Sequence, residues 1–388
     1  MKSAPAYRNV VFVALNVSAN LRWTDVVQPH RFCLIRDCVS STLAGKNQLS
    51  PLRQNRGILI TNYSFLTILS SLVCFGQATL LIHRESEIGS QAGGTAAIVN
   101  PIRCDSSGNI YFRGFEPPNS QLPLLRLSSD GKKAATFRAE ESSNSSNSLK
   151  DEFELKSVSA FAVHSDGGVF HLVIDTKDRP SILEFAKDGT FKRVIKLDRD
   201  WEPTGLAVFA SGGFRVSGMA VMTSDPFQSK PAIALFDDRG RFVKSVETGE
   251  SPTTDADLAR QVGLGMVESG SDYVYILRQA TKPFVLLISP AGEVLKRLPI
   301  DPPNDMAISD LRVGPGRMLI RFFAPVTGTA REKAVFSLYD NMEGRKLLDY
   351  EEAPGVSGIF ACFDWKNTFS YLSLDERGQR TLVNATVR

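Results

Sequence analysis

The chain has 388 residues and is rich in Phe (24) and Tyr (8), which favour strands, and in Gly (29) and Pro (20), which favour turns. Its formal charge of +3 is set by residues 1–57, which hold eight Lys or Arg and two Asp and leave 37 basic and 40 acidic residues elsewhere. Because this remainder is near neutral and has no basic stripe, nucleic acid is excluded from the expected partners.

Residues 1–57 contain none of the repeated turns found later in the chain, and they precede a segment typical of export signals. Such signals ordinarily begin within a few residues of the start of a protein. We therefore expect residues 1–57 to be a doubtful or disordered extension, or a start-site artefact with translation beginning near residue 58.

The segment of residues 58–78 indicates membrane targeting. It has no charged side chain, Arg53 and Arg56 precede it, and residues 65–75 have the length of a signal-peptide hydrophobic core. Cleavage after Ala78 is one alternative, and a membrane anchor is the other, because the uncharged run is long enough to span a bilayer. Both alternatives place the following residues outside the cytoplasm. The protein is thus expected to be secreted, periplasmic or membrane-anchored, with membrane contact only through an uncleaved segment.

Glycine-bearing turns recur in two columns from about residue 101, each after a short apolar run. The first column contains Gly108, Gly167, Gly212, Gly270 and Gly316, and the second contains Gly131, Gly189, Gly240, Gly292, Gly344 and Gly378. A two-residue hairpin turn requires a positive φ that glycine adopts at little steric cost, so each column marks a repeated hairpin. The second-column intervals of 58, 51, 52, 52 and 34 residues are those of four-stranded propeller blades with variable loops.

These intervals predict an all-β, six-bladed β-propeller with four-stranded antiparallel blades over residues 79–388. The last interval is short, and its blade can supply only three strands, at residues 359–363, 368–374 and 381–387. We expect residues 79–83 to complete this blade, because closing the ring removes an unpaired sheet edge. The alternative begins the third strand at Tyr371 and leaves a shortened blade.

One unit also carries a family resemblance. Residues 105–112, the strand at 124–127 and the Asp130-Gly131 turn resemble the NHL-type repeat of bacterial six-bladed propellers, a TolB-like class. The resemblance extends loosely over residues 79–388, although residues 314–317 depart from the Ser-Gly-Asn pattern. The resemblance implies an exported propeller. It assigns no catalytic residue, because relatives of this class include interaction scaffolds, lactonases and lyases.

Cys104 and Cys362 lie at matching places on the inner strands of the first and last predicted blades. In an exported protein they could form a disulfide across the ring closure. The alternative, favoured because free cysteine is so often simply core, is a pair of buried thiols. Matching positions on neighbouring strands could also lie farther apart than the ~5.5 Å Cα separation that a disulfide prefers.

Titratable residues near the turns have a structural and a functional interpretation. His164, His171 and Asp166 surround one turn and could contribute to a metal site, but an ordinary hairpin places any two such residues together and no fourth ligand follows. Asp105 and Asp188 are expected to hydrogen-bond the backbone of their own turns. No metal ligand is therefore assigned.

The long connections, such as residues 113–123 and 222–231, are predicted to emerge together on one face of the ring. Loop elaboration on one face marks where a scaffold carries function, and arginine and aromatic residues are enriched in binding hot spots. The candidate binding residues on this face are Arg113, Trp201, Phe227, Arg278, Arg321 and Arg331.

The expected function is a monomeric binding or interaction module for a peptide, protein or glycan, without a cofactor and without catalysis. The alternative is a metal-dependent, lactonase-like hydrolase with calcium held in the central channel by carboxylates and amides of several blades. No catalytic residue can be assigned from the sequence. A channel cluster of three or more ligands would favour the hydrolase.

Overall fold

The computed structural model describes fourteen stretches of the chain. These are residues 79–89, 97–116, 120–139, 153–198, 201–222, 225–247, 266–269, 272–278, 282–303, 306–324, 333–353, 356, 358–374 and 380–387. Within these ranges lie 24 β-strands. No helix in the same ranges has the length and apolar character needed to cross a membrane. The expectations for residues 1–57 and 58–78 lie outside the described residues.

Four sheets contain four strands each, in sequence order, with neighbouring strands antiparallel. The first two contain β2 (Ala97–Cys104), β3 (Ile110–Glu116), β4 (Ser120–Leu127), β5 (Lys133–Phe137), and β6 (Leu155–Val163), β7 (Val169–Asp175), β8 (Pro180–Phe185), β9 (Phe191–Lys196). The next two contain β10 (Trp201–Val208), β11 (Phe214–Met222), β12 (Asp225–Phe236), β13 (Phe242–Ser245), and β14 (Met266–Ser269), β15 (Val274–Arg278), β16 (Phe284–Ile288), β17 (Val294–Pro299).

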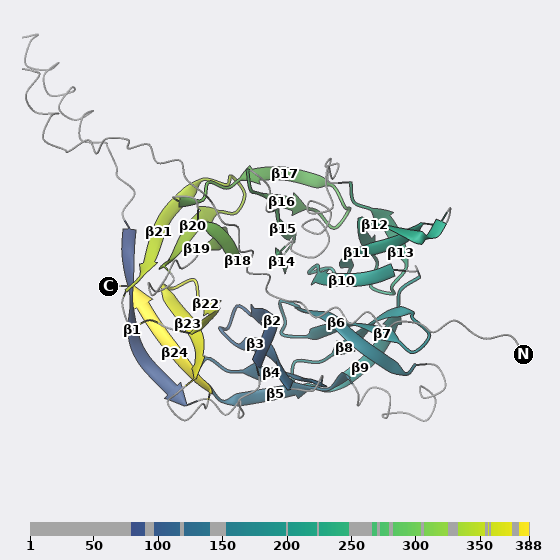
Figure 1. The fold of residues 1–388 in the computed structure, drawn as a ribbon, viewed down its shortest axis with the longest axis horizontal. Helices are drawn as coiled ribbons and strands as arrows, with labels where there is room; N and C mark the ends of the chain where they lie inside the picture. Colours follow the sequence, from purple (N-terminus) through teal and green to yellow (C-terminus); the bar gives the residue numbers. More distant parts are fainter. Residues whose placement is uncertain are drawn as a thin grey trace, which may run out of the picture. The chain divides into compact units, whose positions relative to one another are not determined.

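The remaining eight strands form one sheet in the order β18-β19-β20-β21-β1-β24-β23-β22. Their bounds are β18 (Ala307–Gly314), β19 (Arg317–Ala324), β20 (Lys333–Asp340), β21 (Lys346–Glu352), β1 (Thr79–Gly89), β24 (Arg380–Val387), β23 (Thr368–Leu374) and β22 (Ile359–Phe363). The sheets stand around a common centre with β2, β6, β10, β14, β18 and β22 on their inner sides, which is a β-propeller (Figure 1). The sequence predicts six blades, whereas the structure has four separate four-stranded sheets and this eight-stranded one.

Strand β1 links the two ends of the described chain. It pairs antiparallel with β24 from Ile82, opposite Val387, to Gly89, so only residues 82 and 83 of the expected strand 79–83 make the predicted contact. It also pairs in parallel with β21, where Ile82 lies opposite Glu352, a contact that the sequence does not predict. Because Tyr371 lies inside β23 and does not begin a strand, the alternative with a shortened blade is wrong.

The turn glycines have the backbone conformation that the sequence predicts. In both columns the described glycines have positive φ, for example 79° at Gly131 and 92° at Gly189. The turns themselves are longer than the expected two residues: Ala186 N–H donates to Thr190 O, and Gly189 N–H donates back to Ala186 O. These bonds make the glycine the last residue of a three-residue loop, and the register shift between Glu184 and Phe185 marks a separate bulge at Lys192 of β9.

Buried apolar side chains lie between neighbouring sheets. Tyr111 and Phe137 of the β2–β5 sheet pack against Phe161 and Phe185 of the β6–β9 sheet, and all four are at most 2% exposed. Further clusters join the β6–β9, β10–β13 and β14–β17 sheets in succession and then reach β18–β20. Strands β22–β24 contribute to two more clusters. One joins them to β19–β21, and the other joins them to β2–β4. Burying each such aromatic or aliphatic side chain stabilises the fold by about 1.5–3 kcal/mol.

A disulfide joins Cys104, at the end of β2, to Cys362 in β22, with a Cα–Cα separation of 5.7 Å. The favoured interpretation of two buried free thiols is therefore corrected. Both cysteines lie on inner strands, where neighbouring sheets approach each other most closely, and this proximity brings matching positions within bonding reach.

Candidate functional site

A pocket of about 370 Å³ lies where the inner strands of several sheets end. Its lining residues follow β2, β6, β10, β18 and β22 or lie close to those ends, so consecutive sheets around the centre all contribute. The residues that carry its chemistry are Asp105, His164, Tyr275, Arg312, Asn341 and Trp365. The short glycine turns also lie at this end of the strands, on the face opposite the long connections.

Trp365 supplies an aromatic surface at this pocket and is held in an unusual backbone conformation. Its φ of 61° lies in the left-handed region, which costs a bulky residue about 1–3 kcal/mol. The turn is fixed by Asp364, whose Oδ1 accepts hydrogen bonds from Lys366 N–H at 2.7 Å and Thr368 N–H at 2.9 Å. The indole packs edge-on against Phe363, with ring centroids 5.1 Å apart.

Gly314 makes room for this indole. A methyl group at Gly314 would overlap the six-membered ring of Trp365. The departure of residues 314–317 from the repeat pattern therefore has a local cause, because the side chain of another turn occupies the space beside Gly314.

Two pocket residues retain hydrogen-bonding capacity. Asn341 is 7% exposed and donates from Nδ2 to Gly314 O at 3.2 Å, while its Oδ1 has no hydrogen-bond partner. Tyr275 is 2% exposed and lines the pocket. Burial, with smaller contributions from Tyr273 and Asp340, raises the pKa of Tyr275 to about 12, so the phenol is a neutral donor at physiological pH.

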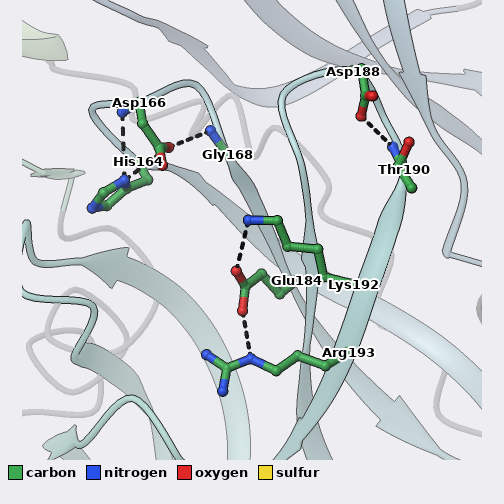
Figure 2. Close-up of polar contacts among 8 residues, drawn as sticks. All are labelled: His164, Asp166, Gly168, Glu184, Asp188, Thr190, Lys192 and Arg193. Atoms are coloured by element: carbon green, nitrogen blue, oxygen red, sulfur yellow. Dashed lines mark hydrogen bonds and ion pairs between the residues drawn. The ribbon is translucent and has the colours of Figure 1, made fainter.

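His164 lines the pocket and forms a polar pair with Asp166, which Figure 2 shows. His164 Nδ1 lies 2.9 Å from Asp166 Oδ1, which also accepts a 2.7 Å hydrogen bond from Gly168 N–H. Burial would raise the pKa of Asp166, but the Gly168 hydrogen bond and His164 outweigh it and lower the pKa. Asp188 likewise accepts from Thr190 N–H at 2.9 Å, so these aspartates serve their own turns as the sequence predicts.

His171 does not join this pair. It is 1% exposed and its Nδ1 lies 2.9 Å from Arg113 Nη2, between the β2–β5 and β6–β9 sheets. Burial and the Arg113 charge lower the pKa of His171 well below its ordinary value. Among the described residues no group of three or more His, Cys, Asp or Glu is placed to hold a metal ion.

Arg312 connects the pocket to the neighbouring strands. Its Nη1 donates to Asp310 Oδ1 at 2.6 Å, and its Nη2 donates to Ala361 O of β22 at 3.4 Å. The guanidinium also lies over the Phe360 ring, 5.4 Å from its centroid. Burial raises the pKa of Asp310, and the charges of Arg312, Arg103 and Arg321 oppose that shift.

The candidate binding residues do not gather at this pocket. Arg113 lies inside β3 and Arg278 ends β15, and each is only 6% exposed, so the expectation of exposed loop arginines is corrected at both positions. The strands extend farther than predicted and take the arginines into the interfaces between sheets. Their role in binding stays a prediction.

The other four candidates are only partly described. Arg321 is a half-buried residue of β19 whose Nη1 donates to Ser309 Oγ at 3.1 Å. Trp201 begins β10, and Phe227 lies in β12 and not in the expected loop of residues 222–231. Arg331 lies outside the described residues.

Sequence reasoning missed the pocket residues Tyr275, Asn341 and Trp365. The one available signal was the double-glycine departure at residues 314–317, which indicates that something bulky packs beside that turn. Nothing in the sequence links this turn to Trp365, because their contact depends on how the two ends of the eight-stranded sheet meet.

Comparison with known proteins identifies no family: no family model and no curated protein matches the chain. Solved structures give weak similarities. The propeller domain of the Trilobed protease from Pyrococcus furiosus aligns at 10% identity over 74% of this chain and 79% of that one, with a TM-score of 0.39. The Dos1 propeller aligns at 10% identity over 72% and 75%, with a TM-score of 0.37. A eukaryotic initiation factor aligns at 11% identity over 66% of this chain and only 55% of its own, with a TM-score of 0.32.

Proposed function

We propose that the chain is an exported binding module built on a closed, six-bladed propeller of the NHL-repeat-like, TolB-like class. The eight-stranded sheet divides naturally at the parallel β1–β21 pair, which leaves β18–β21 as one blade and β22–β24 with β1 as another. The interfaces between sheets support this interpretation, because each set of four strands packs on two neighbours.

Export is the second part of this proposal. The Cys104–Cys362 disulfide supports it, since disulfides persist chiefly in oxidising compartments. The segment of residues 58–78 would direct the propeller out of the cytoplasm, either as a cleaved signal or as an anchor. Outside the cytoplasm we expect a monomer that takes a protein, peptide or glycan ligand and no nucleic acid.

The ligand is proposed to insert a small group into the pocket beside Trp365. The observation that carries this proposal is the strained backbone of Trp365, in a turn that Asp364 fixes and beside a glycine, Gly314, that leaves room for the indole. Backbone strain that a surrounding structure over-determines is typical of functional sites. The pocket volume of about 370 Å³ lies within the range of small-ligand sites, and Asn341 Oδ1 and the Tyr275 hydroxyl offer an acceptor and a donor.

An array of immobilised peptides and oligosaccharides, probed with the full chain, tests this proposal. Trp365→Ala should weaken binding of any ligand that the wild type binds. The loss of binding free energy should be at least about 2 kcal/mol, or roughly thirtyfold in Kd. Lys366→Ala is the matched control, because Lys366 is exposed in the same turn. Equal binding by both variants would show that the ligand is held elsewhere.

The metal-dependent hydrolase is distinguished by a different measurement. Metal analysis of the purified chain, together with a panel of lactones, reports directly on bound calcium and turnover. Bound calcium together with turnover would show that the hydrolase, and not the binding module, is the correct function.

A further inference from the structure

The pocket beside Trp365 contains an acidic residue, Asp105, whose carboxylate is already used by its own turn. Asp105 Oδ1 accepts hydrogen bonds from the N–H groups of Ser107 at 2.9 Å and Asn109 at 3.0 Å. Its Oδ2 accepts from Asn109 Nδ2 at 2.8 Å and from the hydroxyl of Tyr111 at 2.9 Å. A carboxylate has about four acceptor sites, so Asp105 has little capacity left to bind a cationic ligand.

The other titratable side chains that line the pocket are also paired or neutral. Arg312 is 4% exposed and donates from Nη1 to Asp310 Oδ1 at 2.6 Å. His164 Nδ1 lies 2.9 Å from Asp166 Oδ1. Tyr275 is a neutral phenol, because burial raises its pKa to about 12. Among the described lining residues none therefore presents a charge without a partner, and since an unpaired charge is costly to desolvate, the pocket favours an uncharged ligand.

One polar group of the pocket wall lacks a hydrogen-bond partner among the described residues. Asn341 follows β20, lines the pocket and is 7% exposed. The orientation of its amide is fixed, because Gly314 O can only accept and therefore pairs with Nδ2, at 3.2 Å. Asn341 Oδ1 is then an acceptor without a donor, which is unfavourable for a buried group. A hydroxyl group of a ligand in the pocket would supply the missing donor.

An apolar surface adjoins this acceptor. Asn341 and Trp365 both contact Gly314, the first through the Gly314 carbonyl and the second through the space that a Cβ would fill. The edge-on contact with Phe363 holds the indole of Trp365, and Pro315 adds an apolar ring to the same wall. Because the acceptor and the indole share Gly314 as a neighbour, a ligand no larger than one sugar ring can reach both of them.

Given the binding function proposed for this chain, on which this step rests, we propose that the pocket takes an uncharged pyranose residue of a glycan. A C–H face of the sugar ring packs on the Trp365 indole, and a hydroxyl group donates to Asn341 Oδ1. Polar groups reach the pocket from several sheets, with His164 after β6, Tyr275 in β15 and Asn341 after β20. A pyranose carries neutral hydroxyl groups around its whole ring and matches this distribution, whereas an inserted peptide side chain brings a polar group at one end only.

The test is ligand-observed NMR titration of the full chain with the methyl glycosides of glucose, mannose, galactose and N-acetylglucosamine, and with methyl glucuronide as the charged probe. At least one neutral glycoside should bind saturably, and at least about tenfold more tightly than methyl glucuronide, because the wall has no unpaired cation for a carboxylate. Trp365→Ala and Asn341→Ala should each weaken that binding at least about tenfold. Lys366→Ala and Met342→Ala are the matched controls, since each removes an exposed side chain next to the tested one and should leave binding unchanged.

If either alanine variant does not fold, the wild type decides by itself. Saturation of the aromatic protons of the protein should then pass mainly to the C–H protons on one face of the bound sugar ring, and even transfer over the whole ligand overturns the proposal. Absence of saturable binding to all four neutral glycosides, equal binding of methyl glucuronide, or equal losses in the control variants also overturns it. A peptide that binds and requires Trp365, with no glycoside bound, overturns the pyranose and leaves the binding module standing. Binding of neither a peptide nor a glycoside overturns both.

Discussion

Reduction of the Cys104–Cys362 disulfide should destabilise the propeller by a calculable amount. The bond spans a sequence separation of 258 residues, and the chain-entropy relation gives an upper bound of ~5.5 kcal/mol for a closed loop of that length. Native disulfides usually deliver ~2–5 kcal/mol, because the unfolded chain retains some structure. We therefore expect reduction to lower the free energy of unfolding by between ~2 and ~5.5 kcal/mol.

Equilibrium denaturation in guanidinium chloride, with and without reductant, measures this effect. The slope against denaturant should also rise, since the reduced chain unfolds to a more exposed state. A Cys104→Ala, Cys362→Ala double variant is the control and should not respond to reductant. The entropic explanation is refuted if the native protein contains the bond, shown by alkylation before and after reduction, and yet its stability does not change.

Three further predictions concern the strand pairing, the turns and the acid response. Ile82 is fully buried, whereas Leu81 is 45% exposed. In urea denaturation, Ile82→Ala should lower the free energy of unfolding by about 2–5 kcal/mol and Leu81→Ala by under about 0.5 kcal/mol. Equal losses in the two variants would contradict the position of β1. Gly189 and Gly316 both have positive φ, but a Cβ at Gly189 would overlap Thr136 O, whereas the space beside Gly316 is open. In thermal unfolding, Gly316→Ala should therefore lose about 1–2 kcal/mol of stability, and Gly189→Ala should lose more. Burial would raise the pKa of Asp175, but hydrogen bonds from Arg179 and Lys177 outweigh it and lower the pKa. Its contribution to stability is thus present above pH 3.8 and lost as the pH falls through the folded pKa, and Asp175→Asn should flatten that fall in denaturation curves between about pH 5 and pH 2.

The sequence predicts the parts of this fold that depend on local geometry. Gly131 and Gly189 mark hairpins because few other residues accept their φ, and the same requirement recurs in each unit. The short last interval also indicates that a strand from elsewhere must pair with β24, which is the role of β1. The eight-stranded sheet is not predictable in this way, because the parallel contact between β1 and β21 has no signature of its own.

The candidate site depends on features that a one-dimensional pattern does not carry. Arg113 and Arg278 look like loop residues because they end apolar runs, but the strands continue far enough to bury them. Trp365 looks like an ordinary aromatic residue after a strand, and only its φ and its contact with Gly314 distinguish it. Positions so distant in sequence meet only after the sheets have assembled.

The position of β1 between β21 and β24 has a consequence for the order of folding. Strand β1 is synthesised before every other strand described, and β24 is synthesised last, so their pairing cannot form until the whole propeller is available. Pairings between such distant segments fold slowly, because the entropy of closing the loop is lost before the contacts form. The disulfide is subject to the same delay, because Cys362 lies in β22 and is synthesised 258 residues after Cys104.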